Sequence, residues 1–369
     1  MREGWKILKV KDICEKATSN IAQKEIVDLT GDYPVYGAGG YVQNVGFYHR
    51  EKPYIGIVKD GSGVGRVGTY PAKSSLLGTM QYIIPKDGYM LGYVSYLLKS
   101  LHLADFATGA AIPHIYFKEY GECEVPVPPF PEQNRIVAEL DLLQGIIDKQ
   151  KTQLKELDTL AQSIFYDMFG DPVENKKGWV LRKLEEVCNS ITDGDHMPPP
   201  KAERGIPFIT ISNIDKVSRT IDFQNTFFVP REYYDKIKYD RIAEKGDLLY
   251  TVTGSYGIPV IVKDSKPFCF QRHIALLKPD ATIIRTEYLC YWALSASVKQ
   301  IADDCATGIA QKTVGLNFIR KFPITLPPMD IQNIFATIIE AIEHQKASIN
   351  ASIAETQKLF DYTMDKYFG

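Results

Sequence analysis

The sequence predicts an α+β protein in which two similar mixed α/β domains are each followed by a long helix, with the two helices antiparallel. Two observations predict this architecture. Segments from the first half of the chain return in the second half, in the same order. Each half also ends in a segment of about forty residues whose apolar side chains follow helical spacing.

The internal repeat is visible at both ends of each copy. Gly4-Trp5 returns as Gly178-Trp179, at an offset of 174 residues. Ala107-Thr108-Gly109 returns as Ala306-Thr307-Gly308 at an offset of 199, which then holds without a gap to the last two residues. Because the offset grows by 25 residues within the globular part, we expect that part to vary between the copies while the helical part does not.

The two long segments each carry an apolar stripe at steps of mostly three and four residues. The first stripe consists of Ile136, Leu140, Leu143, Ile147, Leu154, Leu157, Ile164 and Met168. The second consists of Phe335, Ile339, Ile342, Ile349, Ile353, Phe360 and Tyr367. Polar residues interrupt the stripes at Gln150 or Lys151 and at Lys346. Since globular helices average about twelve residues, a seam between the two helices fits better than packing of each helix on its own domain alone.

The predicted boundaries follow from the Pro-Pro pairs that end each globular part. They give a first domain over 1–128, a first helix over 129–170, a second domain over 171–327 and a second helix over 328–369. Two like units joined in tandem close through pseudo-two-fold symmetry, which makes the helices antiparallel. A helix of about 38 residues is roughly 57 Å long.

Charge is distributed unevenly along this chain of 369 residues, whose net charge is −2. Residues 131–170 carry seven acidic and four basic side chains, and residues 329–369 carry six and three. The remaining, globular parts therefore carry an excess of four positive charges. An excess this small attracts phosphate only weakly, so tight binding to DNA would need cationic surface from a partner.

The sequence contains no sign of a membrane segment, a disulfide framework or a metal site. No run of eighteen apolar residues occurs, and no apolar stretch of a signal peptide follows the first residues. The six cysteines are scattered, without a Cys-x-x-Cys pair, and the six histidines lack metal-binding spacing. We expect a cytoplasmic protein that holds no metal.

Glycine-rich loops follow predicted strands at comparable places in the two copies. Residues 63–68 fit the pattern G-x-G-x-x-G, but Thr69-Tyr70-Pro71 predicts a turn where a dinucleotide site needs a helix. In the second copy Gly254-Ser255-Tyr256-Gly257 follows the strand over 247–252. Two interpretations stay open for these loops: a tight hairpin, or a close approach of backbone to a ligand.

Catalytic motifs are missing. Val127-Pro128-Pro129-Phe130 lacks the Asp or Asn with which the similar motif of DNA amino-methyltransferases begins, and no Walker loop or Gly-x-Ser-x-Gly elbow occurs. Glu174-Asn175-Lys176 precedes Pro279-Asp280, the reverse of the common nuclease order. Around His196, residues 192–201 resemble a metal cluster, but a turn stabilised by aspartate side chains fits better.

Together these features resemble the specificity subunits of type I restriction–modification systems, over the whole chain. The residues that carry the resemblance are Gly178-Trp179, the Asp193-Gly194-Asp195-His196 loop, Gly246-Asp247-Leu248-Leu249 leading to Gly254-Ser255, Ala306-Thr307-Gly308-Ile309-Ala310-Gln311, Leu326-Pro327-Pro328 with Gln332, the Phe-Gly endings, and the stretch Tyr33–Gly40. The first copy departs at Ile112-Pro113, where the second has Gln311-Lys312. This departure leaves the role of His114 open.

The resemblance implies two target-recognition domains that read the two halves of a bipartite sequence in double-stranded DNA. The long helices are implied to form the spacer and to dock modification (methyltransferase) subunits, which restriction or motor subunits then join. S-adenosylmethionine, ATP and Mg²⁺ are expected only in these partners, and the chain itself is expected to catalyse nothing. The helix length would separate the domains by more than one DNA turn of about 34 Å.

The DNA-contact residues are predicted from chemistry: they are donors near loops that recur in both copies. Arg and Lys suit guanine edges or phosphates, and Gln311 suits adenine. In the first domain they are Lys59, Ser62, Arg66, Lys73 and His114, and in the second they are His196, Lys201, Arg204, Ser255, Tyr256, Arg272, Gln311 and Lys312. For each, an ordinary solvated surface residue is the alternative.

Two other functions compete with this interpretation. One is the recognition subunit of a fused or type II-like restriction–modification enzyme, which the sequence does not separate from the first. The other is a coiled-coil interaction protein without a role on DNA, which predicts no sequence-dependent DNA binding even when partners are present.

Overall fold

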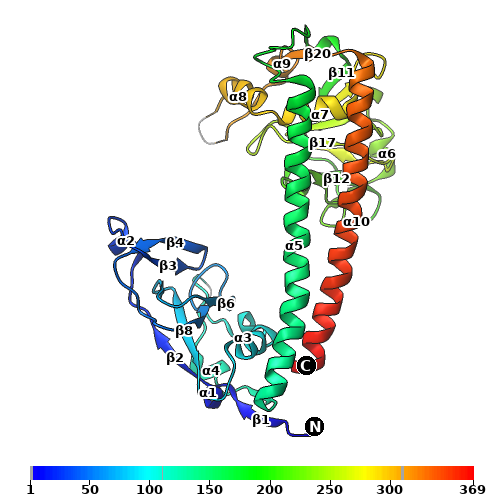
Figure 1. The fold of residues 1–369 in the computed structure, drawn as a ribbon. Helices are drawn as coiled ribbons and strands as arrows, with labels where there is room; N and C mark the ends of the chain where they lie inside the picture. Colours follow the sequence, from blue (N-terminus) through cyan, green and yellow to red (C-terminus); the bar gives the residue numbers. More distant parts are fainter. Residues whose placement is uncertain (1–2, 110, 309–310) are drawn as a thin grey trace. The chain divides into compact units, whose positions relative to one another are not determined.

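The computed structural model of the protein describes residues 3–109, 111–308 and 311–369. Ala110, Ile309 and Ala310, next to the repeated Ala-Thr-Gly motifs, lie outside the described residues. The chain divides into two compact units: unit 1 contains Met1–Thr152 and Asn350–Gly369, and unit 2 contains Gln153–Ile349. Each long helix therefore contributes one part to each unit (Figure 1).

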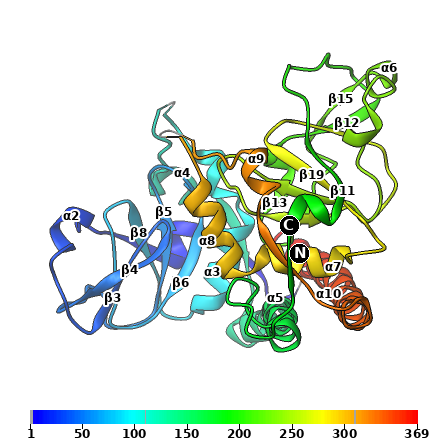
Figure 2. The ribbon, with the colours of Figure 1, turned by 90° about the horizontal axis from the view of Figure 1, so that it is seen from above.

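Unit 1 is built around an antiparallel four-stranded sheet with the order β2-β8-β5-β6. A smaller sheet has the order β4-β3-β7, in which β3 and β7 are parallel, and β1 pairs with β9. Helix α3 lies beside β6 (Figure 2) and also packs on β5 and β8. The bounds are β1 Lys6–Lys9, α1 Val10–Ile13, β2 Cys14–Thr18, α2 Gln23–Ile26, β3 Tyr33–Gly37, β4 Gly40–Val45, β5 Tyr54–Val58, β6 Val67–Tyr70, β7 Ser75–Leu76, β8 Met80–Pro85, α3 Leu91–Ser100, η1 Leu103–Phe106, α4 Phe117–Tyr120 and β9 Glu124–Val127.

Unit 2 repeats this plan. Its sheets have the orders β11-β19-β16-β17 and β15-β12-β18, and β10 pairs with β20. The bounds are β10 Val180–Lys183, η2 Leu184–Glu186, β11 Cys188–Asp193, β12 Ile206–Ile209, η3 Ile211–Asn213, β13 Ile214–Asp215, β14 Thr220–Ile221, β15 Phe227–Val229, α6 Arg231–Tyr234, η4 Tyr239–Arg241, β16 Leu248–Thr251, β17 Pro259–Ile261, β18 Cys269–Phe270, β19 Ile274–Pro279, α7 Thr286–Leu294, α8 Ala296–Cys305, α9 Leu316–Ile319 and β20 Pro323–Leu326.

The sequence repeat is therefore a repeat of topology, as predicted. The central strands β5 and β16 are buried along their whole length, which is why their sequences do not alternate between apolar and polar residues. The copies differ most between β3 and β7, where unit 2 contains the additional hairpin β13-β14. The offset between the copies accordingly rises from 173 residues at the start of β3 and β12 to 194 at the start of β7 and β18.

The two long helices are α5 (Phe130–Phe169) and α10 (Met329–Phe368). In unit 1 the start of α5 lies beside the end of α10: the Tyr367 hydroxyl donates to Glu139 at 2.8 Å and the Gln150 amide donates to Ser352 at 2.7 Å. In unit 2 the end of α5 lies beside the start of α10, where Asp158 pairs with Lys346 at 2.9 Å. The helices are antiparallel, as predicted.

The apolar stripe of α5 differs from the predicted one near the end of the helix. Ile136, Leu140, Leu143 and Ile147 are buried as expected, but in the last turns Ala161, Phe165 and Phe169 are the buried side chains. The predicted Ile164 and Met168 are only partly buried. The physical reason is that the end of α5 packs against α7 as well as α10, so a second surface selects a neighbouring face of the helix.

The end of each long helix belongs to the core of a globular part. In unit 2 the Phe169 ring lies 4.8 Å from Tyr288 of α7 and 5.2 Å from Phe335 of α10, between ring centroids. In unit 1 the Phe368 ring lies 5.3 Å from Tyr93 of α3. Packing of a helix on a domain and pairing of the two helices therefore occur together.

Two absences apply to the described part of the chain. None of its helices combines the length and the apolar character that crossing a membrane requires. Within the same residues, no three His, Cys, Asp or Glu side chains gather in a way that could hold a metal ion.

Candidate DNA interface

Each unit joins its glycine-rich hairpin to the segment after the Ala-Thr-Gly motif by the same backbone contacts. In unit 1 the Gly61 N–H donates to the Pro113 carbonyl at 2.9 Å, and Ile115 donates to Lys59 at 3.0 Å. In unit 2 the Gly254 N–H donates to the Lys312 carbonyl at 2.9 Å. We call these paired segments the joined loops: residues 59–66 with 112–115 in unit 1, and 252–258 with 311–314 in unit 2.

The glycines of the joined loops are required by geometry. Gly61 and Gly254 have φ of 78° and 68°, in the left-handed region that favours glycine. The glycines of the Ala-Thr-Gly motifs, Gly109 and Gly308, also have positive φ. A Cβ on Gly308 would lie 2.4 Å from the Gln311 carbonyl oxygen. Strand β6, and not a helix, follows residues 63–66, so the loop is a hairpin and lacks the helix that a dinucleotide site needs.

The predicted residues of unit 1 lie on or beside its joined loops, except Lys73. The His114 ring pairs with the Asp60 carboxylate, and the Lys59 ammonium lies 3.7 Å from that carboxylate. Arg66 donates to the Ala38 carbonyl at 2.9 Å, which ties the hairpin to the β3–β4 turn. Ser62 is exposed on the hairpin. Lys73, exposed and with φ of 53°, lies on the separate turn before β7.

In unit 2 three of the predicted residues line one concave surface, which we call the second hollow. His196, Arg272 and Gln311 surround it, and its volume is about 350 Å³. The other lining residues are Asp193, Val252, Thr253, His273, Thr313, Val314, Gly315 and Leu316. Burial, and then the charge of Arg272, lower the pKa of His273 below its ordinary value, which favours a neutral ring beside a cationic Arg272.

An aspartate side chain holds the Asp193–His196 segment. The Asp193 carboxylate accepts from the His196 ring, three residues further along, at 2.9 Å and from the Arg241 guanidinium at 3.0 Å, so it connects the segment both within itself and to η4. Gly194 passes so close to Phe270 that a Cβ would lie 2.0 Å from the carbonyl oxygen of that residue. Arg241 was missed by the sequence analysis because it comes from η4, far along the chain.

The other predicted residues of unit 2 are not among the residues that line the second hollow. Tyr256 donates to Asp303 of α8 at 2.7 Å and lies under the Lys299 ammonium, 4.2 Å from the ring centroid. The hydrogen bond to Asp303 raises the pKa of Tyr256. The Lys201 ammonium lies 5.2 Å from the centroid of the Phe227 ring. Arg204 and Lys312 are exposed, and Ser255 is partly buried and accepts from Thr251 through its carbonyl.

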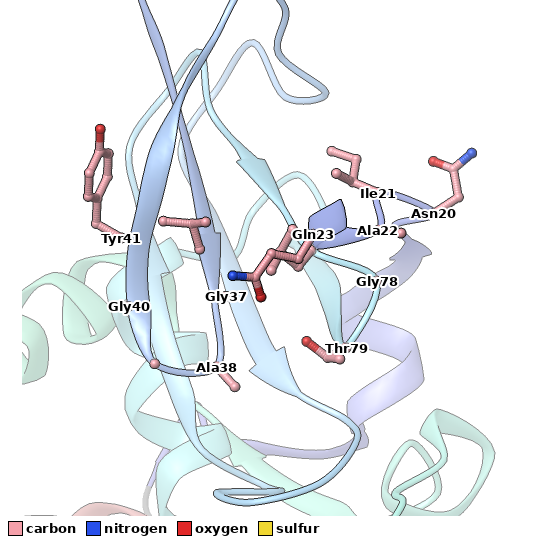
Figure 3. A pocket seen from close by; sticks show the side chains of 13 residues that line it. Asn20, Ile21, Ala22, Gln23, Gly37, Ala38, Gly40, Tyr41, Gly78 and Thr79 are labelled. Carbon is pink, nitrogen blue, oxygen red and sulfur yellow. The ribbon is translucent and has the colours of Figure 1, made fainter. Parts of the chain in front are cut away.

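Unit 1 contains a concave surface that the sequence analysis missed, which we call the first hollow (Figure 3). Its volume is about 650 Å³, and it lies between the Gly37–Gly40 turn, the segment 20–23 and Gly78-Thr79. The complete lining is Asn20, Ile21, Ala22, Gln23, Gly37, Ala38, Gly39, Gly40, Tyr41, Val42, Leu77, Gly78 and Thr79. The residues of segment 20–23 do not recur at the corresponding place in the second half of the sequence; the glycines of the Tyr33–Gly40 stretch were the available signal.

One protein family matches both halves of the chain. The family described as "Type I restriction modification DNA specificity domain" matches residues 2–159 and 176–357. The specificity subunit of the type I restriction enzyme MjaIX, from Methanocaldococcus jannaschii, is 23% identical over 315 residues, which are 77% of this chain and 69% of that protein. The putative type I restriction enzyme specificity subunit S.HindORF215P, from Haemophilus influenzae, is 23% identical over 383 residues, 97% of this chain and 93% of that protein.

Solved structures share the fold. The crystal structure of a type I restriction–modification S subunit from M. genitalium superposes with a TM-score of 0.59 at 16% identity, covering 99% of this chain and 96% of that one. A chain from a study of complex assembly and conformational transition in a type I R–M system gives a TM-score of 0.53 at 16% identity, covering 99% of this chain and 98% of that one.

Proposed function

This chain belongs to the type I restriction–modification DNA specificity family, which recognises DNA targets, and on that basis we propose that it is the non-catalytic specificity subunit of a type I complex. Each globular part reads one half of a bipartite DNA sequence. The observation that carries this proposal is the presence of one framework twice with different exposed side chains. Two domains of the same fold therefore present different hydrogen-bonding groups to DNA.

The joined loops support the assignment of the reading surface. Their backbone contacts are the same in both units, whereas Asp60 and His114 of unit 1 are replaced by Thr253 and Thr313 in unit 2. A fixed backbone that presents variable donors and acceptors is what a sequence reader needs, because base edges differ only in their hydrogen-bonding pattern and in the thymine methyl group.

The partner subunits supply the chemistry in this proposal. The antiparallel parts of α5 and α10 dock the modification subunits, which bind S-adenosylmethionine, and the restriction subunits bring ATP and Mg²⁺. Residues 131–170 and 329–369 each carry three net negative charges, so we expect the docking surfaces of the partners to be basic. The small excess of positive charge on the globular parts is consistent with a protein that binds DNA tightly only within the complex.

Mapping methylated bases tests the proposal directly. We expect methylation of a split sequence motif in the source genome, and loss of that motif when the gene is deleted. Replacing residues 179–327 with the corresponding segment of a relative should change one half of the motif and leave the other half unchanged. A motif that survives the deletion, or a replacement that changes both halves, would contradict the proposal.

A further inference from the structure

The first and second hollows share one wall, which equivalent residues of the two units form. The Thr79 carbonyl accepts from Lys59 N–H at 3.0 Å in unit 1, and the His273 carbonyl accepts from Val252 N–H at 2.9 Å in unit 2. Thr79 and His273 are therefore counterparts, and each lines the hollow of its unit.

A second pair of contacts extends this shared wall to the neighbouring residues. The Gly78 N–H donates to the Ile21 carbonyl at 2.8 Å, and the Arg272 N–H donates to the Asp195 carbonyl at 3.0 Å. Gly78 therefore takes the place of Arg272, one of the predicted DNA-contact residues. The segment that follows Ile21, with Ala22 and Gln23, takes the place of the segment that begins at His196.

The two hollows differ in chemistry. Arg272 and His196 give the second hollow cationic and imidazole donors, whereas no Asp, Glu, Lys or Arg is among the residues that line the first. The first hollow is also more spacious, at about 650 Å³ against about 350 Å³. An uncharged, open surface with amide and hydroxyl groups suits a base edge better than a phosphate, which attracts cations.

Gln23 is the polar side chain best placed to use this space. It extends from the start of α2 toward Gly37, whereas Asn20 and Tyr41 point away from the space between these segments (Figure 3). The side chain of Gln23 is exposed, and within the described residues its amide makes no hydrogen bond. A free amide offers a donor and an acceptor side by side, the pattern that the N7 and N6 atoms of adenine match.

The opposite wall allows another molecule to come close. A Cβ on Gly39 or Gly40 would meet no heavy atom within 4 Å, so this turn faces open space, and Gly40 has φ of 110°, which disfavours other residues. Arg66, bonded to the Ala38 carbonyl, stands at the edge of the same turn. A cation at the rim of an uncharged hollow can hold a phosphate while a base edge is read beside it.

We propose that the first hollow reads an adenine in the first half of the DNA target and that Gln23 is the residue that determines this preference. Its Nε2 donates to adenine N7, and its Oε1 accepts from the N6 amino group. This inference rests on the proposed function and adds to it a reading site and a base for unit 1.

The test uses the full chain in complex with its modification subunits and a pool of double-stranded DNA with randomised positions. Wild-type complex selects the split motif, and single-base variants of that motif are then measured by competition. For Gln23→Ala we expect affinity for the selected DNA to fall about 10- to 100-fold and the adenine preference to disappear at one position of one half. Gln23→Glu should prefer cytosine at that position, because a carboxylate accepts from the cytosine amino group.

Asn44→Ala is the matched control, since Asn44 is an exposed amide of β4 that does not line the hollow. It should retain all base preferences. An unchanged preference in Gln23→Ala, or an equal loss of affinity for every DNA sequence, would overturn the inference. If the wild type selects a split motif that changes on mutation of Arg272 but not of Gln23, only this inference fails. If the wild type selects no motif, the proposed function fails as well.

Discussion

Gln332 and Arg285 are joined by a hydrogen bond that has a copy in the other half of the chain. The Arg285 N–H donates to Gln332 Oε1 at 2.9 Å, and the Met90 N–H donates to Gln133 Oε1 at 2.9 Å. Both glutamines are buried, and each also donates to a proline carbonyl of the Pro-Pro pair. In each unit a glutamine thus connects the start of a long helix to the residue before a shorter one: α5 to the residue before α3, and α10 to the residue before α7.

The first prediction concerns the stability that this contact provides. Gln332→Ala should lower the free energy of unfolding by about 1–3 kcal/mol, because it removes a fully buried side chain and leaves the Arg285 N–H without its acceptor. Urea unfolding monitored by circular dichroism measures the change. Asn333→Ala, one residue further and exposed, should change stability by less than about 0.5 kcal/mol. Equal stability of the two variants would show that the contact contributes nothing.

Arg272 should affect sequence preference in the second half of the target. We expect Arg272→Ala to reduce affinity of the complex for its own motif about 10- to 100-fold and to relax the preference at one position. Arg272→Lys should restore affinity but not preference, since lysine lacks the planar fork that binds a guanine edge at two atoms. Lys266→Ala, an exposed cation outside the hollow, serves as the control. A uniform loss over all sequences would instead indicate a phosphate contact.

The length of the helices should set the unread gap between the two halves of the motif. The Gln150–Ser352 contact shows which positions lie opposite each other, so four residues are inserted after Lys151 and after Ala351 together. This adds about one helical turn, roughly 6 Å, and keeps the apolar stripes nearly in phase. Methylation mapping should show unchanged half-motifs with a gap longer by about one or two base pairs. Altered half-motifs would contradict the role of the helices.

Glu343 predicts a pH dependence of stability. Burial alone raises the pKa of Glu343, but hydrogen bonds from Lys263 and Lys346 more than offset burial, so its pKa in the folded state lies below the ordinary value. Such a carboxyl contributes stability above its unfolded pKa of about 4.3, and this contribution is lost as the pH falls through the folded value. Glu343→Gln should therefore be less stable near neutral pH and lose less stability on acidification. The exposed Glu340→Gln should follow the wild-type pH profile.

The purified chain should show no methyl transfer, DNA cleavage or ATP hydrolysis when it is supplied with S-adenosylmethionine, ATP and Mg²⁺. Adding modification subunits should produce methylation and tighten DNA binding at the same salt concentration. Radiolabelled methyl transfer and fluorescence anisotropy measure the two effects. Turnover by the chain alone, surviving removal of trace partners, would place a catalytic site where none is expected.

The repeat, the helices and their antiparallel arrangement were predictable because backbone packing constrains the residues concerned. Gln133 and Gln332 recur because each bonds to buried backbone groups, and Gly109 and Gly308 because a Cβ would collide with a carbonyl oxygen. The face of α5 near Phe165 was not predictable in the same way. Helical spacing gives the period of a stripe, but the position of α7 decides which neighbouring face is buried.

The reading surfaces were only partly predictable. His196, Arg272 and Gln311 were chosen as isolated donors, and only folding shows that they line one hollow. The first hollow escaped notice because Gln23 lies in a segment whose residues differ from those of its counterpart after Asp195. Residues that read different DNA sequences have no reason to repeat, so self-comparison is least informative where specificity resides.

The core of the first globular part includes Phe368 and Tyr367, which follow Tyr93 only after the whole second copy has been translated. During synthesis, part of the apolar surface of the first copy therefore stays uncovered until the second copy has been translated. Recombination that exchanges one copy between related genes must also preserve the helix end that completes the other. The DNA specificity of one globular part can thus change independently of the other, whereas the folding of each part depends on the other copy.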